Sequence, residues 1–232
     1  SLLLFVGAFL MVMAALIFVA TAGEDVSGSG RFALVVAFTA GFIVAGAVCY
    51  RFPRVDLAGR VFLAIGAFLT PLVFASVHTF LLDGSDFPTD VLWLAGSTYS
   101  TVFYGAVAVL RVGRLYSYLT GVALLVAWGS LAAVLNVPTE WVPAMYVVLA
   151  GILSLPLWRQ WRWSPLALIE SGWVFTHLIT PPALMLTIIW GLNVDSLRSE
   201  LWFLPVTLAL GAVFYGMQPR PGQMTRLAAL VL

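Results

Sequence analysis

The sequence contains very little charge. Only 9% of its 232 residues are charged and 62% are hydrophobic, whereas a typical soluble domain carries about 25% charged residues. A chain so poor in charge cannot cover a surface that faces water, so the composition excludes an ordinary soluble protein and indicates an integral membrane protein. The net charge of +1 gives no reason to expect a nucleic acid as partner.

Cysteine, histidine and lysine are also scarce. Cys49 is the only cysteine, which excludes an internal disulfide and a cysteine-rich metal site. The sequence has two histidines, His78 and His177, and all 11 of its basic residues are arginines. It contains no Walker motif, G-x-S-x-G motif or zinc-ligand set. We therefore predict a protein without enzymatic activity and without a metal site.

Long apolar runs are what the sequence does contain. A membrane helix needs about 20 mostly apolar residues. In lipid the backbone must bond within the span, and these runs are too long for barrel strands, so we predict an all-α polytopic transmembrane bundle. The eight runs that qualify are 2–22, 32–50, 61–82, 91–110, 115–135, 141–158, 166–190 and 201–217.

Both ends of the chain suggest that more sequence belongs to it. Residues 227–232 resemble the start of a ninth span, and the chain does not begin with methionine. The connecting loops are short, which leaves no room for an inserted soluble domain. We expect residues 1–232 to form a single transmembrane domain that is a fragment of a longer membrane protein.

The charges of the loops predict an orientation. By the positive-inside rule, arginine-rich loops face the cytoplasm. Acidic residues gather in the loops after the odd-numbered spans, so those loops are expected outside. The loops after spans two, four, six and eight hold Arg51, Arg54, Arg60, Arg111, Arg114, Arg159, Arg162, Arg220 and Arg226.

The alternation of loops makes the helical hairpin the expected unit. GAFL occurs at Gly7–Leu10 and again at Gly66–Leu69, which hints at tandem duplication of hairpins. The runs VGAFLMVMAALIFVATAG, RFALVVAFTAGFIVAGAV and DLAGRVFLAIGAFLTPL resemble a family of uncharacterised bacterial multi-pass membrane proteins built from repeated hairpins. The resemblance covers residues 6–150. It implies a bacterial inner membrane and assigns no catalytic residue.

The seventh span contains the strongest candidate for a functional site. Pro181 and Pro182 have no backbone N–H, which leaves the carbonyls of His177 and Leu178 without their helical donors. A proline also disfavours helical geometry at the residue before it. We therefore predict that this span is kinked or broken near the middle of the membrane.

Three residues of this span share one face. Glu170, His177 and Pro181 follow one another at i, i+7 and i+11. With Thr180 and Pro182 they predict a substrate or proton path. The alternative is structural: Glu170 pairs with Arg159 or Arg162, His177 bonds a neighbouring helix and the prolines only bend the span.

The third span repeats part of this pattern. Thr70-Pro71 matches Thr180-Pro181, and His78 follows within the same span. Paired interrupted helices are a feature of transporters, although single prolines are common in membrane helices. His78 and His177 lie at different expected depths, so they do not share an ion. Each could singly ligate a haem or a chlorin, and we expect no cofactor.

Two further groups of residues are candidates. In the fourth span, Ser97, Thr101 and Tyr104 offer hydroxyls that either line a wet cavity or allow close helix packing, and packing is the expectation. The turn after the sixth span joins tryptophans of an aromatic belt to arginines, which predicts anchoring to lipid or a docked partner. This turn comprises Trp158, Arg159, Trp161, Arg162 and Trp163.

Two functions follow from these features. Short loops and few buried ionisable groups favour a structural, accessory or scaffold component that contacts lipid and other membrane subunits. The competing hypothesis is a transporter or permease whose site is the seventh span.

Overall fold

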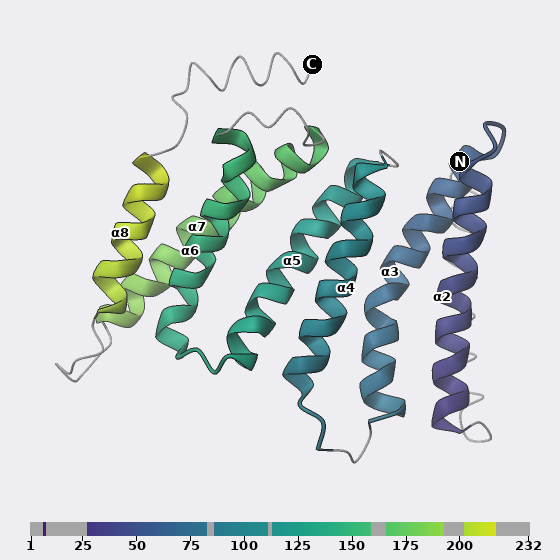
Figure 1. Cartoon of the computed structure of the whole chain (residues 1–232), viewed down its shortest axis with the longest axis horizontal. Helices are drawn as coiled ribbons and strands as arrows, with labels where there is room; N and C mark the ends of the chain where they lie inside the picture. The colour runs from purple at the N-terminus through teal and green to yellow at the C-terminus, as the bar shows by residue number, and fades with distance from the viewer. Residues whose placement is uncertain are drawn as a thin grey trace. The chain divides into compact units, whose positions relative to one another are not determined.

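A computed structural model of the chain describes Gly7 and residues 27–82, 86–110, 113–158, 166–192 and 202–216. These residues form helices and no strand (Figure 1), which confirms the all-α prediction for them. The expected first span lies outside the described residues apart from Gly7, and the expected ninth span lies wholly outside them. The elements are α2 (Gly28–Tyr50), α3 (Asp56–Phe80), α4 (Thr89–Val109), α5 (Arg114–Val134), the 3-10 helix η2 (Thr139–Trp141), α6 (Val142–Trp158), α7 (Leu166–Leu192) and α8 (Phe203–Gly216).

The chain divides into two compact units, Ser1–Ser100 and Thr101–Leu232. The boundary falls inside α4. Each unit has its own set of helix contacts and is described by itself below. The single transmembrane domain expected from the sequence stays a prediction.

In the first unit, α2 and α3 form an antiparallel pair with very close backbones. Ser27 caps α2 by accepting a hydrogen bond from the Gly30 N–H at 3.3 Å. A Cβ atom on Gly46 would lie 2.7 Å from the backbone nitrogen of Leu63. A Cβ on Gly59 would lie 2.5 Å from the backbone nitrogen of Tyr50. The two helices approach so closely only because glycine occupies these positions.

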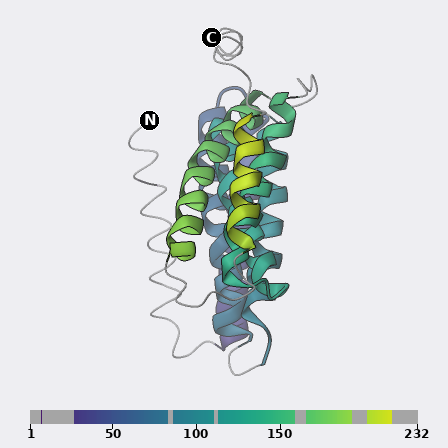
Figure 2. The same cartoon turned by 90° about the vertical axis from the view of Figure 1, so that its left-hand side faces the viewer.

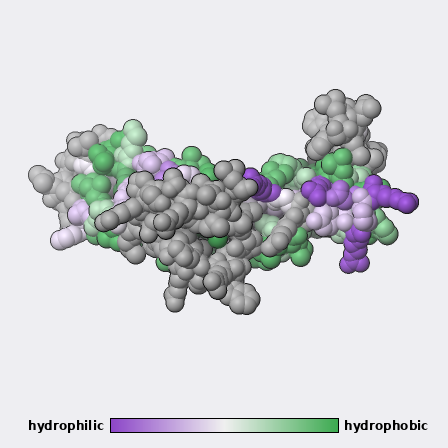
Figure 3. All heavy atoms as spheres, turned by 90° about the horizontal axis from the view of Figure 1, so that it is seen from above, coloured by the Kyte–Doolittle hydropathy of each residue, from purple (hydrophilic) through white to green (hydrophobic). Residues whose placement is uncertain are grey.

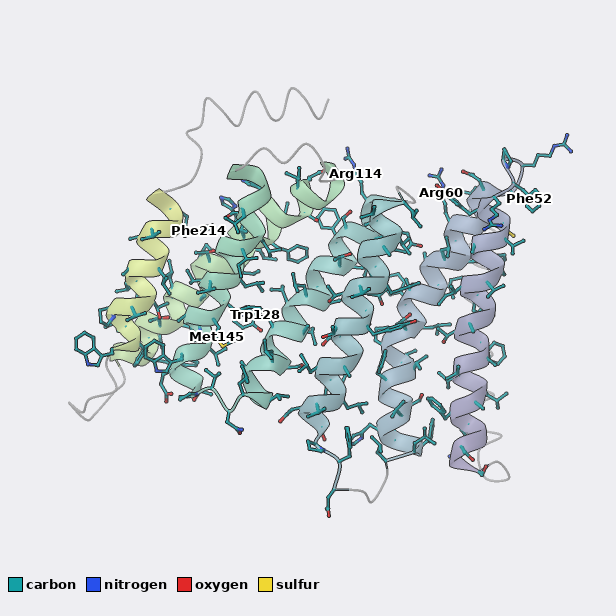
Figure 4. The ribbon with its side chains drawn as sticks, viewed as in Figure 1. Phe52, Arg60, Arg114, Trp128, Met145 and Phe214 are labelled. Carbon is teal, nitrogen blue, oxygen red and sulfur yellow. The ribbon has the colours of Figure 1, made fainter. Side chains whose placement is uncertain are left out.

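In the second unit, consecutive helices run antiparallel. The indole Nε1 of Trp128 in α5 donates to the carbonyl oxygen of Met145 in α6 at 2.9 Å (Figure 4). On the other side of α6, a Cβ on Gly172 of α7 would lie 3.3 Å from the carbonyl oxygen of Leu153. Since α5 and α7 both run antiparallel to α6, they are parallel to each other.

Helices α7 and α8 complete this unit. They lie side by side in both ribbon views (Figures 1 and 2). A Cβ on Gly191 would lie 3.1 Å from the side chain of Leu204, and one on Gly211 would lie 2.7 Å from that of Leu184. Small residues thus mark the contact points here too.

The number of membrane-spanning helices differs from the prediction of eight spans and a ninth. Within the described residues, four helical stretches are long and apolar enough to cross a membrane: Gly28–Tyr50, Asp56–Phe80, Arg114–Val134 and Ile169–Gly191. Two apolar helices, Thr139–Leu155 and Phe203–Gly216, are shorter. Helix α4 has 21 residues but is not among the four, because its serine, threonine and tyrosine residues lower its hydropathy.

The glycine contacts lead to a testable prediction. We expect Gly46→Ala to lower the free energy of unfolding by about 1–3 kcal/mol, as overpacking does, because its Cβ would press on backbone atoms of α3 that cannot turn away. The measurement is chemical unfolding in detergent followed by circular dichroism. Gly151→Ala in α6 is the control, since a Cβ there would meet nothing within 4 Å. Equal losses for both variants would contradict the interpretation.

Candidate functional site

Helix α7 carries the residues that the sequence singles out, and it is continuous. Its helical conformation runs from Leu166 to Leu192 with Pro181 and Pro182 inside. Of the two expected alternatives, the broken span was therefore wrong, and a kink at these prolines stays a prediction. Both prolines are exposed, so their rings do not push into a neighbouring helix of the described chain, and an α-helix can continue past them at the cost of backbone hydrogen bonds.

Thr180 does not face the same side as the prolines. Its side chain is fully buried, and its hydroxyl donates to the carbonyl oxygen of Thr176 at 2.7 Å. The hydroxyl of Thr176 in turn donates to the carbonyl oxygen of Trp173 at 2.7 Å. Both hydroxyls are thus satisfied by their own helix.

His177 is half-buried and held by its own helix. Its Nδ1 lies 2.9 Å from the carbonyl oxygen of Trp173, and its ring lies against that of Trp173, with the centroids 4.4 Å apart and the planes tilted by 35°. A carbonyl can only accept, so Nδ1 carries the proton and Nε2 of the neutral ring keeps its lone pair. The ring of Phe214 in α8 meets the imidazole edge-on at 6.4 Å. Nε2 is therefore the atom that could hold a metal of a haem or chlorin.

Glu170 has a partner that the sequence did not suggest. Its Oε2 lies 3.8 Å from Nε of Arg114 at the start of α5. The Arg114 and Glu170 side chains are 67% and 34% exposed, so the pair contributes little to stability, in the range of about 0–1 kcal/mol. The partners expected from the sequence, Arg159 and Arg162, lie outside the described residues. Glu170 and His177 thus contact different groups, Arg114 and Trp173.

Three buried polar atoms have no hydrogen-bond partner among the described residues. They are the hydroxyls of Tyr116 and Ser117 in α5 and the indole Nε1 of Trp173 in α7. Ser117 follows Arg114 by three residues, and Trp173 follows Glu170 by three. The parallel helices α5 and α7 therefore carry these atoms at the same end as the ion pair. No pattern in the sequence indicated this grouping, because the common depth of these residues depends on which helices are parallel.

The buried face of α7 is rich in hydroxyls, which was also not anticipated. Thr176, Thr180 and Thr187 are fully buried, whereas Leu178 and Met185 are 62% and 64% exposed. A helix in a water-soluble protein has the opposite pattern. The signal was present in the sequence, since Thr176, Thr180, Ala183 and Thr187 recur at i, i+4, i+7 and i+11.

The third span has the same local arrangement around its proline. Thr70 in α3 is buried, and its hydroxyl donates to the carbonyl oxygen of Gly66 at 2.9 Å. Pro71 is exposed within a continuous helix. His78 is exposed, with its Nε2 3.4 Å from the hydroxyl of Thr89. Both Thr-Pro steps therefore turn threonine inward and proline outward, each within its own unit.

The hydroxyls of α4 follow the same rule. Ser97 and Ser100 are buried, and their hydroxyls donate to the carbonyl oxygens of Trp93 and Gly96 at 2.5 and 2.8 Å. Tyr104 is buried and Thr101 half-buried. This arrangement favours the packing interpretation of Ser97, Thr101 and Tyr104 over the wet cavity.

The tryptophan–arginine turn cannot be assigned a contact. The backbone of α6 ends at Trp158, and Arg159, Trp161, Arg162 and Trp163 lie outside the described residues. Anchoring by this turn stays a prediction. Among the described residues, no group of three His, Cys, Asp or Glu side chains could hold a metal ion.

Comparison with known proteins gives no match, whether with protein-family models, with curated proteins or with solved structures.

The outward prolines of α7 lead to a prediction. We expect the double variant Pro181→Ala, Pro182→Ala to fold with unchanged or higher free energy of unfolding, because alanine restores the N–H donors for the carbonyls of His177 and Leu178. The assay is chemical unfolding in detergent. Pro71→Ala in α3 is the matched control and is expected to behave alike. A large loss of stability in the double variant would show that the prolines make a contact that α7 needs.

Proposed function

We propose that the protein is a non-enzymatic, multi-pass structural or accessory component of a bacterial inner membrane, which binds other membrane proteins through the outer face of α7. The observation that carries the proposal is a backbone acceptor on that face. The carbonyl of Leu178 loses its donor at i+4 to Pro182 and its alternative donor at i+3 to Pro181. Leu178 is 62% exposed.

The surroundings of this acceptor support the proposal. Leu178, Met185, Leu186 and Ile188 make the exposed face of α7 strongly apolar. A backbone carbonyl without a donor is costly in lipid, by several kcal/mol. A neighbouring helix with a serine, threonine or asparagine side chain would satisfy it, and such polar contacts join membrane helices.

The exposed surface of the described chain also supports a membrane location. Large apolar side chains such as Phe68, Val102 and Leu110 are 61%, 67% and 70% exposed. Exposed apolar area of this extent marks contact with lipid or protein. Apart from Tyr104 and Tyr116, the buried residues with polar side chains in the described chain are all serines or threonines: Thr39, Thr70, Ser76, Ser97, Ser100, Ser117, Ser154, Ser171, Thr176, Thr180, Thr187 and Thr207.

The finer topology is part of the proposal. Eight spans with a ninth beginning at residue 227, arranged as tandem hairpins, agree with the alternating loop charges. Hydrophilic residues gather near the turn between α2 and α3, at the right of Figure 3, where Arg51, Arg54 and Arg60 are exposed. We propose that this turn is cytoplasmic. The resemblance of residues 6–150 to uncharacterised bacterial hairpin proteins supports the same location.

A transporter is the second candidate. It is favoured by the polar end of α5 and α7, where the Arg114–Glu170 pair lies at the same end as buried polar atoms that have no partner in the described chain. Ordered water commonly satisfies such groups. In this candidate Glu170 would exchange protons, and His177, seven residues later in α7, would be the next polar group on the path.

Native mass spectrometry of the intact protein, released gently from its own membrane, tests the proposed function. We expect recovery with partner proteins at fixed stoichiometry. The double variant Pro181→Ala, Pro182→Ala is expected to lose partner occupancy, because Leu178 then has a donor within its own helix. Recovery of the natural protein alone, with no partner, would contradict the proposal.

A second pair of variants separates the two candidates. Glu170→Gln and His177→Ala alter the polar groups of α7 without touching its outer face. The accessory role predicts that both variants keep their partners and complement a deletion strain. If both variants fold and keep their partners but fail to complement, the transporter becomes the better account.

A further inference from the structure

The turn between α2 and α3 carries positive charge without a matching acid. Arg51, Arg54 and Arg60 are all exposed. With Asp56 as the only acid, three arginines give residues 51–60 a net charge of +2. Arg60 pairs with Asp56 at 2.8 Å. Among the described residues, no acidic side chain pairs with Arg51 or Arg54. These two guanidinium groups are therefore available to an anion from outside the chain.

The backbone of this turn is held in place. At its far end α3 packs directly on α2, because a Cβ atom on Gly59 would lie 2.5 Å from the backbone nitrogen of Tyr50. Three backbone hydrogen bonds of 3.0 to 3.1 Å connect the turn to α2 and to itself, from Arg51 to Val48, from Phe52 to Cys49 and from Val55 to Phe52. The arginines thus start from a fixed backbone, which lowers the cost of ordering them around a ligand.

An open apolar groove lies further along α2. It has a volume of about 490 Å³, and α2 lines it from Leu34 to Ala45 together with Phe62 of α3. Every side chain in this lining is apolar. Phe42 and Phe62 meet with ring centroids 6.0 Å apart, and a Cβ atom on Gly41 would meet nothing within 4 Å. Atoms that border a gap lack van der Waals contacts, so an apolar occupant of the groove is favoured.

An apolar strip connects the groove to the turn. Val48 follows Gly41 by seven residues, so the two share one face of α2. Val48 is 51% exposed, and Phe52 within the turn is 58% exposed. Phe52 and Arg60 lie at the same end of the α2–α3 hairpin (Figure 4). The surface therefore changes from apolar to cationic at this end, as the surface of a phospholipid does.

The spacing of these features fits one leaflet of a membrane. Ala45 lies six residues before Arg51, or about 9 Å along the helix axis, and Gly41 lies ten residues before it, or about 15 Å. The hydrocarbon layer of one leaflet is roughly 15 Å thick, half of the bilayer core. An acyl chain whose phosphate is level with Arg51 would therefore pass Ala45 and reach Gly41.

We propose that the α2–α3 hairpin binds an anionic phospholipid, with the phosphate at Arg51 and Arg54 and one acyl chain in the groove beside Gly41. Arginine binds phosphate oxygens through two parallel N–H donors. An anionic lipid is favoured over a zwitterionic one, because the ammonium group of the latter offsets its phosphate. The site depends on the membrane location included in the proposed function, but not on the partner contact of α7.

Competition between two lipids tests the headgroup site. The purified chain is freed of lipid in detergent and given equal amounts of phosphatidylglycerol and phosphatidylcholine with the same acyl chains. Native mass spectrometry then counts the bound molecules of each. We expect phosphatidylglycerol to be preferred, and Arg51→Gln and Arg54→Gln each to lower the preference about five-fold. That factor corresponds to about 1 kcal/mol for one arginine near an anionic surface.

The control for this experiment is Arg114→Gln, which removes the same charge from an exposed arginine of α5. It is expected to leave the preference unchanged. An equal loss in Arg114→Gln would show that only the net charge matters and would overturn the site. A preference that persists in both turn variants would overturn it as well. The chain is tested without partners, so a failure here is distinct from a failure of the partner contact proposed for α7.

A substitution that fills the groove tests the acyl-chain site. We expect Gly41→Leu to lower the bound phosphatidylglycerol several-fold, because its side chain would occupy the path of the acyl chain. Gly151→Leu in α6 is the matched control, since its Cβ position is equally open. Circular dichroism checks that both variants keep their helices. Equal lipid binding by the two variants would overturn the proposal, and so would a dimer of the natural chain that Gly41→Leu dissociates, since a second copy would then fill the groove.

Discussion

The packing of this chain depends on how each helix satisfies its own polar side chains. Thr70, Thr180, Thr187 and Thr207 each donate to the carbonyl four residues earlier, at 2.6 to 2.9 Å. A hydroxyl that bonds its own backbone presents only a methyl group and a small volume to the next helix. Neighbouring helices can then come close without burying an unsatisfied donor. The buried faces of these helices therefore combine small hydroxyl residues with a few large side chains such as Phe175 and Phe203, while many other large apolar side chains are exposed.

Glycine also allows helices to pack closely, because it leaves space for atoms of the partner helix. Gly46 and Gly59 admit backbone atoms of the partner helix, and Gly121 of α5 admits the ring of Phe175 from α7. Contacts of this kind specify partners by shape, since only a matching bulge or backbone fits each gap. Between α5 and α6, a Cβ on Gly129 would lie 2.7 Å from the hydroxyl of Tyr146, and there Trp128 and Tyr146 reach carbonyl oxygens of the other helix at 2.9 and 3.3 Å. Close backbones bring donor and acceptor within range.

The hydrophobic runs of the sequence predicted the bounds of these helices well, but they did not predict which residues face outward or which residues pair. The expected spans 115–135 and 166–190 match α5 and α7 within two residues, because long apolar runs have few alternatives to a helix. The break at Pro181 was wrong, since sequence alone does not show that both prolines point outward, where the helix tolerates them. The pairing of Glu170 with Arg114 could not be predicted from the sequence either, because it requires α5 and α7 to be parallel neighbours. The buried threonines of α7 could have been found from their spacing.

The position of the prolines finally distinguishes two functions considered for the polar groups of α7, a transport path and a contact with a partner helix. A transport path needs its free carbonyls and hydroxyls on one inward face, but here the threonine hydroxyls are inward and already bonded. The carbonyl of Leu178, deprived of both helical donors, belongs to a residue on the outward face. An acceptor there is of no use to a solute that moves through the interior of the unit. It would serve another helix that packs against α7, and for this reason we propose a membrane partner rather than a substrate for this helix.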